Sequence, residues 1–525
     1  MALRWSFHDE LSVSGHMAII AEIQNGTYPP RYLSYPDLEL AYHYAFNLLG
    51  ACLTAIFRVQ IPTAIDAISV GSWFYCWCLA WSLGDRLLGR HRGALVASLM
   101  LFGSGYPLFC PEYYSTGAPI GAHLLGFCTV GELYTSPPMV STFFQHPWSM
   151  GLPVSLCIMT VLAARESKPD VWRYGVLALL TAFLSLCQIT LFCAVSGSLL
   201  VAEALPSGRF DRRRALRIAL GLALSVAVAT QLGGFFAPKE AAGLGLEHHL
   251  WVASSFTTTL KWLLASFGLL LPLGLAGLLF LHKERWFYTL MIVGSLGVLN
   301  LVRYKYSWDI VKFAAVTSVA LSVPFAALLD RLLRARIAPV LGRIAGTGAL
   351  MATFATSASF CLTLLFDLPG IPQMYKETPP TISIDDARAA TWLRKRVGPK
   401  DIVYRRKHQT YYEYASWAGL GQVWVDGSCP WALSRYKARE KLMAELPENL
   451  DVWQEARVRF FVLDDEDKTL RARAEQWIAS GRAVSRGSFG SLWIVEIVPM
   501  VPTRERFDAA TSQMIGSPRY GREGQ

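Results

Sequence analysis

Residues Ile310–Leu329 read IVKFAAVTSVALSVPFAALL, twenty residues in which Lys312 is the only charge. A helix of that length reaches about 30 Å, which matches the hydrocarbon layer of a bilayer. Similar blocks of roughly 15 to 22 apolar residues recur through the chain and predict a polytopic α-helical membrane protein with about ten spans. The other predicted spans are Ile65–Leu83, Ala94–Phe109, Met150–Ala164, Gly175–Cys187, Leu191–Ala204, Leu216–Phe235, Trp262–Leu281, Phe287–Val302 and Ile344–Leu365.

The composition excludes an ordinary soluble protein. Of the 525 residues, 53% are hydrophobic and only 17% are charged. The net charge of +10 does not indicate nucleic-acid binding, because the Lys and Arg residues cluster in short gaps between apolar blocks. Most of the ten Cys lie inside apolar blocks and are expected to be small packing residues.

Charge sets the expected orientation. The basic gaps Asp85–Arg92, Arg165–Arg173, Pro206–Arg217, His282–Arg285 and Asp330–Arg343 are predicted to be cytoplasmic. The outer gaps are then Cys110–Trp148, Ala237–Lys261, Arg303–Asp309 and everything after Phe366. This alternation requires Gly175–Ala204 to form a tight hairpin of two short spans.

The segment Tyr44–Val59 is apolar but short. If Tyr44–Val59 were a span, the basic gap Asp85–Arg92 would lie outside. A membrane-surface helix is therefore expected at Tyr44–Val59. Residues 1–64 are then an outer-face loop with juxtamembrane helices. A chain that begins outside suggests that an N-terminal helix precedes this sequence. The alternative is a short N-terminus that is translocated unaided.

After the bundle at 65–366, charge density rises and apolar runs shorten to strand length. Residues 375–500 are predicted to form an extracytoplasmic α/β domain, with a flexible tail at 503–525. The expected helices are Ile384–Lys395 and Lys468–Ser480, and the expected strands are Asp401–Tyr404, Val458–Leu463, Ala483–Arg486 and Ser491–Ile497. The last two strands would form a hairpin across Gly487–Gly490.

Asp9 and Glu10 form an acidic pair ahead of the first apolar run. An attacking hydroxyl needs a carboxylate to accept its proton, and neighbouring carboxylates repel, which raises the pKa of one of them. Both are therefore candidate catalytic residues. The alternative is an acidic helix N-terminus before Leu11–Ile23, and the local sequence favours neither reading. The chain lacks the common nucleotide-binding motifs, so a donor would have to be linked to a lipid.

A second candidate cluster lies between two predicted spans on the outer side. Arg303, Lys305 and Lys312, together with Tyr306 and Asp309, are candidate binding residues for a substrate phosphate. These cations oppose the charge bias of their own side, and a charge at the depth of Lys312 is costly. The alternative is an Asp309–Lys312 pair with two interfacial cations whose side chains reach towards water.

His8 and His16 lie near Asp9 and are candidate substrate-binding residues. They could also ligate a divalent metal, but no spacing here enforces a metal site. No cofactor is expected for the reaction.

The order of these features resembles the GT-C superfamily of polyprenyl-phosphate-sugar-dependent glycosyltransferases, including the protein mannosyltransferase-like branch. The features are the acidic pair, a short helix ending in Gln24-Asn25-Gly26, a Tyr28-Pro29-Pro30 segment, a Tyr42-His43-Tyr44 surface helix, many spans and an outer α/β domain.

The resemblance implies that Asp9 or Glu10 is the base of an inverting displacement. It also implies that Arg303, Lys305 and Lys312 face a lipid phosphate. The lack of an obvious eukaryotic targeting signal favours a bacterial plasma membrane. The expected partners are the bilayer, a polyprenyl-phosphate sugar and a hydroxyl acceptor. The alternatives are a flippase of a lipid-linked saccharide and a non-catalytic scaffold for polysaccharide assembly.

Overall fold

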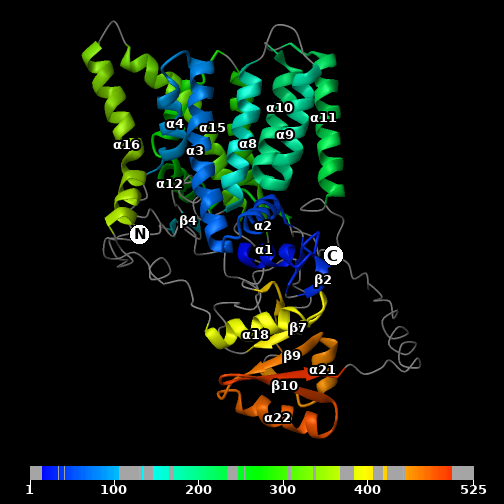
Figure 1. The fold of residues 1–525 in the computed structure, drawn as a ribbon. Coiled ribbons are helices and arrows are strands. Elements are labelled where there is room, and N and C mark those ends of the chain that lie inside the picture. Colours follow the sequence, from blue (N-terminus) through cyan, green and yellow to red (C-terminus); the bar gives the residue numbers. More distant parts are fainter. Residues whose placement is uncertain are drawn as a thin grey trace, which may run out of the picture.

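The computed structural model describes residues 15–33, 35–40, 42–105, 129–130, 133–134, 146–164, 171–206, 209–232, 246–253, 255–282, 284–304, 309–334, 339–366, 383–405, 418–422, 441–442 and 444–498. Long helices form a bundle, and a small sheet with its own helices lies beyond one end of that bundle (Figure 1). Short N-terminal helices and strands occupy the space between the two.

The bundle is built around α15, which spans Lys312–Leu333 and is buried along most of its length. It packs against α4, α10, α13, α14 and α16. The helices of the bundle are α3 (Ile61–Leu88), α4 (Gly93–Phe102), α8 (His146–Ala163), α9 (Val171–Cys187), α10 (Ile189–Ala204), α11 (Arg212–Gln231), α12 (Phe256–Phe267), α13 (Leu270–Gly277), α14 (Arg285–Leu301) and α16 (Pro339–Phe366).

Each predicted span coincides with one of these helices or with a pair of them. Among the described residues, three helices are long and apolar enough to cross a membrane by themselves, namely α8, α11 and α15. The number becomes five if two bent pairs, α12–α13 and α3 with the preceding helix α2 (Ala45–Phe57), each count as one span. The chain is therefore a membrane protein, and the figure of about ten spans stays a prediction.

The span predicted at Trp262–Leu281 is wrong as a single helix. The chain bends there by 81° between α12 and α13. Gly268 adopts φ +52°, a left-handed conformation that disfavours other residues, and its N–H closes α12 on the carbonyl of Leu264. The apolar composition continues through the bend, so hydropathy alone did not reveal it.

The helix α4 ends at Phe102, whereas the prediction continued it to Phe109. Residues beyond Gly105 lie outside the described part of the chain. Ser104 is fully buried, and both its backbone N–H and its hydroxyl donate to the carbonyl of Thr353 in α16. This satisfies the non-helical backbone inside the bundle.

The flanks of the predicted basic gaps meet at one end of the bundle. Arg92, after α3, forms a 2.9 Å ion pair with Asp330 in α15. Arg173, at the start of α9, lies 2.5 Å from Glu203, near the end of α10. The helices α9 and α10 are joined only by Gln188, so the start of α9 can reach the end of α10 only if the two helices run antiparallel. The contact therefore confirms the hairpin predicted at Gly175–Ala204.

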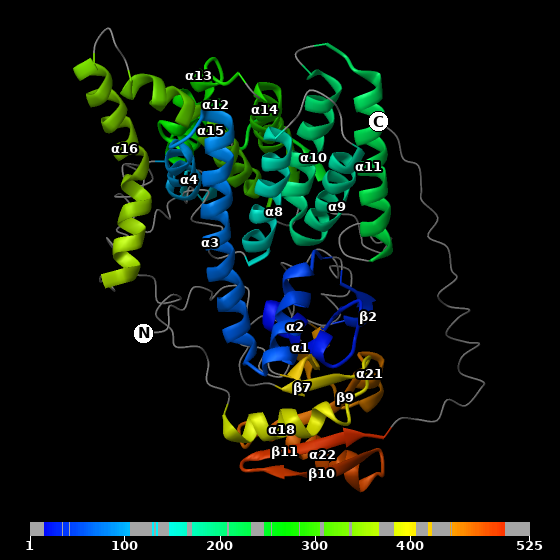
Figure 2. The ribbon, with the colours of Figure 1, turned by 45° about the horizontal axis from the view of Figure 1, so that its top comes forward.

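The N-terminal elements lie at the opposite end of the bundle (Figure 2). They are α1 (His16–Gln24), β1 (Arg31–Tyr32), β2 (Tyr35–Glu39) and α2 (Ala45–Phe57). The axis of α2 turns by 117° into α3, so α2 lies across the start of that helix. This arrangement agrees with the surface helix predicted at Tyr44–Val59.

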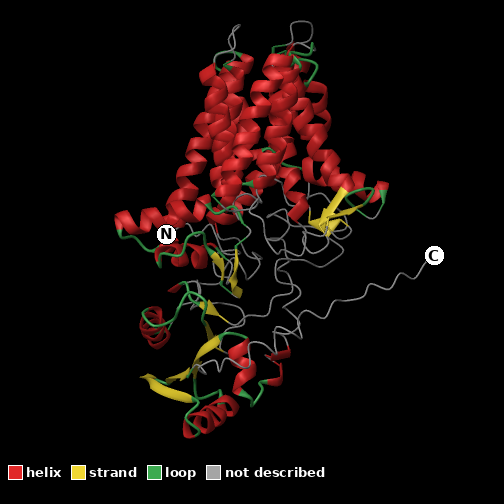
Figure 3. Ribbon diagram, turned by 90° about the vertical axis from the view of Figure 1, so that its right-hand side faces the viewer, coloured by secondary structure: helices red, strands yellow, loops and turns green. Residues whose placement is uncertain are grey.

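The C-terminal unit, residues 383–498, holds a five-stranded sheet in the order β10-β11-β9-β7-β8. Its strands are β7 (Ile402–Arg405), β8 (Gly421–Gln422), β9 (Val458–Leu463), β10 (Ala483–Phe489) and β11 (Leu492–Ile497). Strands β7, β8 and β9 run parallel, and β11 is antiparallel to β9 and β10. Figure 3 shows this sheet well separated from the spanning helices.

Helices cover both faces of this sheet. Val403 and Phe460 face α18 (Ile384–Arg394), whereas Tyr404 and Phe461 face α21 (Leu450–Glu455) and α22 (Lys468–Ala479). The predicted hairpin exists, but β10 continues through Gly487–Phe489 and the turn lies at Gly490–Ser491. The limits of the predicted domain, 375 and 500, and its tail lie outside the described residues.

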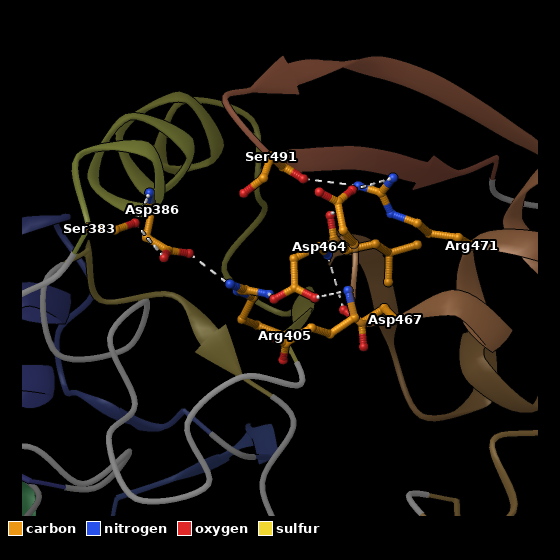
Figure 4. A network of polar contacts seen from close by, with 10 residues as sticks. Ser383, Asp386, Arg405, Asp464, Asp467, Arg471 and Ser491 are labelled. Carbon is orange, nitrogen blue, oxygen red and sulfur yellow. Dashed lines mark hydrogen bonds and ion pairs between the residues drawn. The ribbon is translucent and has the colours of Figure 1, made fainter.

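A buried arginine joins the layers of the C-terminal unit (Figure 4). Arg405, at the end of β7, donates to Asp386 of α18 at 3.2 Å and to Asp464, which follows β9, at 2.9 Å. Ser383 caps α18 by accepting the N–H of Asp386. A buried charge needs such compensation on every side, so this network fixes α18 against the carboxyl ends of β7 and β9.

Candidate functional site

The site lies where α1 meets the end of the helical bundle that is nearer to the C-terminal unit. Apolar side chains hold α1 on two sides. Met17 and Ile20 pack in a cluster with Phe46 and Ile68, and Ile19 packs in another with Tyr32 and Tyr35. His16, the first residue of α1, is buried beneath this packing with an exposed fraction of 2%.

A hydrogen bond determines the tautomer of His16. The side-chain amide of Asn47 in α2 lies 3.0 Å from His16 Nδ1 and also donates to the backbone carbonyl of His16 at 3.2 Å. An amide N–H requires an acceptor, so Nδ1 carries no proton and the neutral ring is protonated at Nε2. His16 is therefore a hydrogen-bond donor through Nε2.

A second imidazole lies against the first. His146 begins α8, and its ring centroid is 5.1 Å from that of His16 at an interplanar angle of 89°. Phe46 contacts both rings, at 5.3 Å and 5.2 Å. The hydroxyl of Ser69 in α3 lies 3.2 Å from His146 Nδ1. Elements from four places in the sequence therefore converge on one buried polar cluster.

Lys312 belongs to the same electrostatic neighbourhood. Burial is the main cause that lowers the pKa of His16 well below its usual value. The charge of His146 lowers this pKa further, the hydrogen bond with Asn47 raises it, and the charges of His43 and Lys312 lower it by smaller amounts. Lys312 is the first residue of α15, so its charge acts on His16 although the two residues are distant in the sequence.

The other predicted site residues are described only in part. Arg303 lies exposed in β6 (Val302–Tyr304), which pairs with β5 (Leu246–His248). Asp309 opens a short 3-10 helix, η5 (Asp309–Val311), but its side chain lies outside the described part of the chain. His8, Asp9, Glu10, Lys305 and Tyr306 lie outside it altogether.

Comparisons with known proteins show which solved structures share the fold of this chain. No protein-family model matches the chain, and no curated protein matches it by sequence. Among solved structures, ArnT from Cupriavidus metallidurans bound to undecaprenyl phosphate matches with a TM-score of 0.51 and 12% identity, over 95% of each chain. Its apo state gives a TM-score of 0.50 and 12% identity, over 94% of this chain and 95% of ArnT. The chain has the GT-C glycosyltransferase fold.

An oligosaccharyltransferase from Archaeoglobus fulgidus is also similar, with a TM-score of 0.49 and 11% identity. The match covers 89% of this chain and 66% of that one. The match to ArnT confirms the GT-C fold predicted from the order of sequence features.

The helix α1 also carries a buried acid near its other end, which the sequence analysis did not point out. Glu22 of α1 is 3% exposed and accepts the backbone N–H of Arg31 with both carboxylate oxygens, at 2.9 and 3.0 Å. Burial raises the pKa of Glu22 to about 8, against smaller opposing effects of this hydrogen bond and of the Arg31 charge. Glu22 therefore holds the end of α1 to the start of β1 chiefly as a neutral acid.

No group of three His, Cys, Asp or Glu residues suited to a metal ion occurs within the described ranges. His8 and Asp9, two of the three residues on which a metal was considered, fall outside those ranges.

Three members of this buried cluster were missed from the sequence, namely Asn47, Ser69 and His146. The predicted span began at Met150, whereas α8 begins at His146. The sequence His146-Pro147-Trp148 did offer a signal, because Pro favours the first turn of a helix and so extends the helix back to the histidine. Asn47 and Ser69 gave no such signal, since their roles depend on contacts between separate helices.

Proposed function

We propose that this protein transfers a sugar from a polyprenyl-phosphate donor to a hydroxyl acceptor on the extracytoplasmic face of the membrane. The observation that carries the proposal is the contact between the buried rings of His16 and His146 at one end of the bundle, with the charge of Lys312 acting on His16. A solved structure of the same fold, ArnT, holds undecaprenyl phosphate, which supports a lipid-phosphate ligand for this chain.

The proposed step is an inverting displacement. The acceptor oxygen attacks the anomeric carbon, the bond from that carbon to the phosphate oxygen breaks, and the prenyl phosphate leaves. The acceptor proton passes to Asp9 or Glu10. Such general base catalysis contributes roughly 10²- to 10⁴-fold. The positions of both carboxylates are a proposal from sequence, since they precede the described residues.

Cations are proposed to hold the departing phosphate as its charge grows. Lys312 is the central candidate, with Arg303 and Lys305 nearer the water. His16, protonated at Nε2, is proposed to donate a hydrogen bond to the donor. It stays neutral near pH 7 because its pKa is lowered, so it binds through a hydrogen bond and leaves the full charge to Lys312.

The test uses the full chain in lipid nanodiscs with undecaprenyl-phosphate hexose as donor and an alkyl glycoside as acceptor. Asp9→Asn or Glu10→Gln should lower kcat by roughly 10²-fold or more while binding of undecaprenyl phosphate persists. Lys312→Gln should weaken that binding, whereas Lys441→Gln, at an exposed position of the C-terminal unit, should change neither quantity.

Unchanged transfer in both carboxylate variants would reject the base assignment. If the wild-type chain binds undecaprenyl phosphate but releases none from the donor, and moves the intact donor between leaflets, the protein is a transporter and the proposed function fails.

A further inference from the structure

We propose that the segment Ala418–Gln422 of the C-terminal unit is a positioning element for α1, and that Gly419 and Asn25 are its positioning residues. This inference rests on the proposed function, because the helix it positions carries His16. Three separate contacts support it.

The first contact is a hydrogen bond at the end of α1. The side-chain amide of Asn25, the residue that ends the helix, donates to the carbonyl of Ala418 at 2.7 Å. The same amide lies 3.5 Å from the carbonyl of Gly419. The last turn of α1 is therefore tied directly to a segment that lies almost four hundred residues later.

The second contact is an approach of one backbone to another. Gly419 has φ +62°, and a Cβ atom added to it would lie 2.6 Å from the carbonyl carbon of Ala21 and from the nitrogen of Glu22. A Cβ atom cannot occupy that space, and backbone atoms of a helix cannot move aside one at a time. Only glycine therefore permits this separation between the segment and α1.

The third contact extends the junction to the strand after α1. A Cβ atom added at Gly421 would lie 3.1 Å from the carbonyl oxygen of Leu33. Glu22 already binds the N–H of Arg31, so α1 and the start of β1 form one body that the segment touches at both ends.

The segment itself is rigidly attached. Gly421 and Gln422 form β8, the edge strand that pairs with the buried strand β7. Ala418 and Leu420 are buried in the apolar layer beneath α18. The segment that contacts α1 is therefore held by the core of the sheet.

The consequence concerns the site at the other end of α1. His16 receives its hydrogen bond from Asn47 of α2, a partner that does not belong to α1. A shift of α1 along its axis would pull His16 away from Asn47, His146 and the neighbourhood of Lys312. A misplacement of about 1 Å can cost as much as 10²-fold in rate, so the docked segment sets the catalytic geometry.

The test compares Gly419→Ala with Gly481→Ala in full-length protein in nanodiscs. Both glycines have a left-handed backbone, at φ +62° and +71°, but a Cβ at Gly481 would meet no atom within 4 Å. The pair therefore separates the clash with α1 from the general strain of alanine at such a φ. Asn25→Ala is a milder third variant that removes only the hydrogen bond to Ala418.

Two readouts are combined. Hydrogen–deuterium exchange should rise across residues 16–24 in Gly419→Ala and, less strongly, in Asn25→Ala. The kcat with undecaprenyl-phosphate hexose should fall roughly tenfold or more in Gly419→Ala, and the donor KM should rise because His16 is proposed to bind the donor. Gly481→Ala should leave both readouts as in the wild type.

Equal losses in the two glycine variants would overturn the proposal, and so would faster exchange in residues 16–24 with an unchanged kcat. Failure of the proposed function gives a different result, since the wild-type chain itself would then release no undecaprenyl phosphate. The exchange difference between the variants does not depend on activity.

Discussion

At the scale of single residues, the site combines groups that a sequence pattern can flag with groups that only folding brings near. Lys312 was predicted to bind substrate because a charge at its depth in the membrane is costly, and His16 because it lies near Asp9 in the sequence. Asn47 and Ser69 are ordinary polar residues of helices, and nothing in their local sequence distinguishes them. Their importance arises from distances of 3.0 and 3.2 Å to imidazoles on other elements.

Glu22 gives a prediction for the dependence of stability on pH. Its pKa is about 8 in the folded protein, against an ordinary value of 4.5, so the folded chain binds more protons between these values. The free energy of unfolding should therefore fall as pH rises from about 4.5 to 8. The integrated effect is roughly 3 to 5 kcal/mol.

Replacing Glu22 by Gln keeps an acceptor for the N–H of Arg31 and removes this titration. We expect Glu22→Gln to unfold at a higher temperature than the wild type at pH 8.5 and at a similar temperature at pH 5. Thermal unfolding in detergent, followed by tryptophan fluorescence, measures this. Glu475→Gln, at an exposed position on α22, is the control, and an equal gain there would refute the explanation.

At the scale of elements, the sequence predicted where most helices and strands lie along the chain, but it did not predict the bends or the exact ends of the helices. Apolar runs located the helices because burial in lipid or in the bundle requires an apolar stretch. The strand at Val458–Leu463 was found to the residue because both of its faces are buried. The 81° bend at Gly268 and the early start of α8 at His146 were missed, since neither changes the mean hydropathy.

The α9–α10 hairpin depends on a buried ion pair. Glu203 has no exposed side-chain surface, and it accepts hydrogen bonds from Arg173 at 2.5 Å and from the hydroxyl of Tyr174 at 3.1 Å. Removing the acid leaves Arg173, which is 11% exposed, without its counter-charge. The cost of breaking such a pair is about 3 to 5 kcal/mol.

Glu203→Ala should therefore lower the yield and the melting temperature of the protein in detergent. Tyr174→Phe removes only one hydrogen bond and should have a much smaller effect, about 1 kcal/mol. Any Glu203→Ala protein that folds should keep the kcat of the wild type, because the pair lies at the opposite end of the bundle from His16. A melting temperature equal to that of the wild type would show that the pair contributes nothing.

At the scale of the whole molecule, the distribution of charge predicts orientation. The basic gaps and the C-terminal unit lie at opposite ends of the bundle (Figure 1). The positive-inside rule places the basic end in the cytoplasm, so the C-terminal unit should face the outside.

Labelling of cysteine variants in intact cells with a maleimide that cannot cross the membrane tests this orientation. Glu475→Cys on α22 should react in intact cells, whereas Arg213→Cys at the start of α11 should react only after the cells are opened; both positions are exposed. Reaction of the native cysteines is subtracted with the wild-type chain. The reverse pattern would invert the topology and place the candidate site in the cytoplasm.

The docking of Ala418–Gln422 against α1 also has a consequence for biosynthesis. Residues 21–33 leave the ribosome long before the segment that supports them has been translated. Contacts between such distant parts of a chain form late. The helix α1 thus receives its final support only near the end of synthesis, and a product terminated before Ala418 would retain the bundle yet lack a finished site.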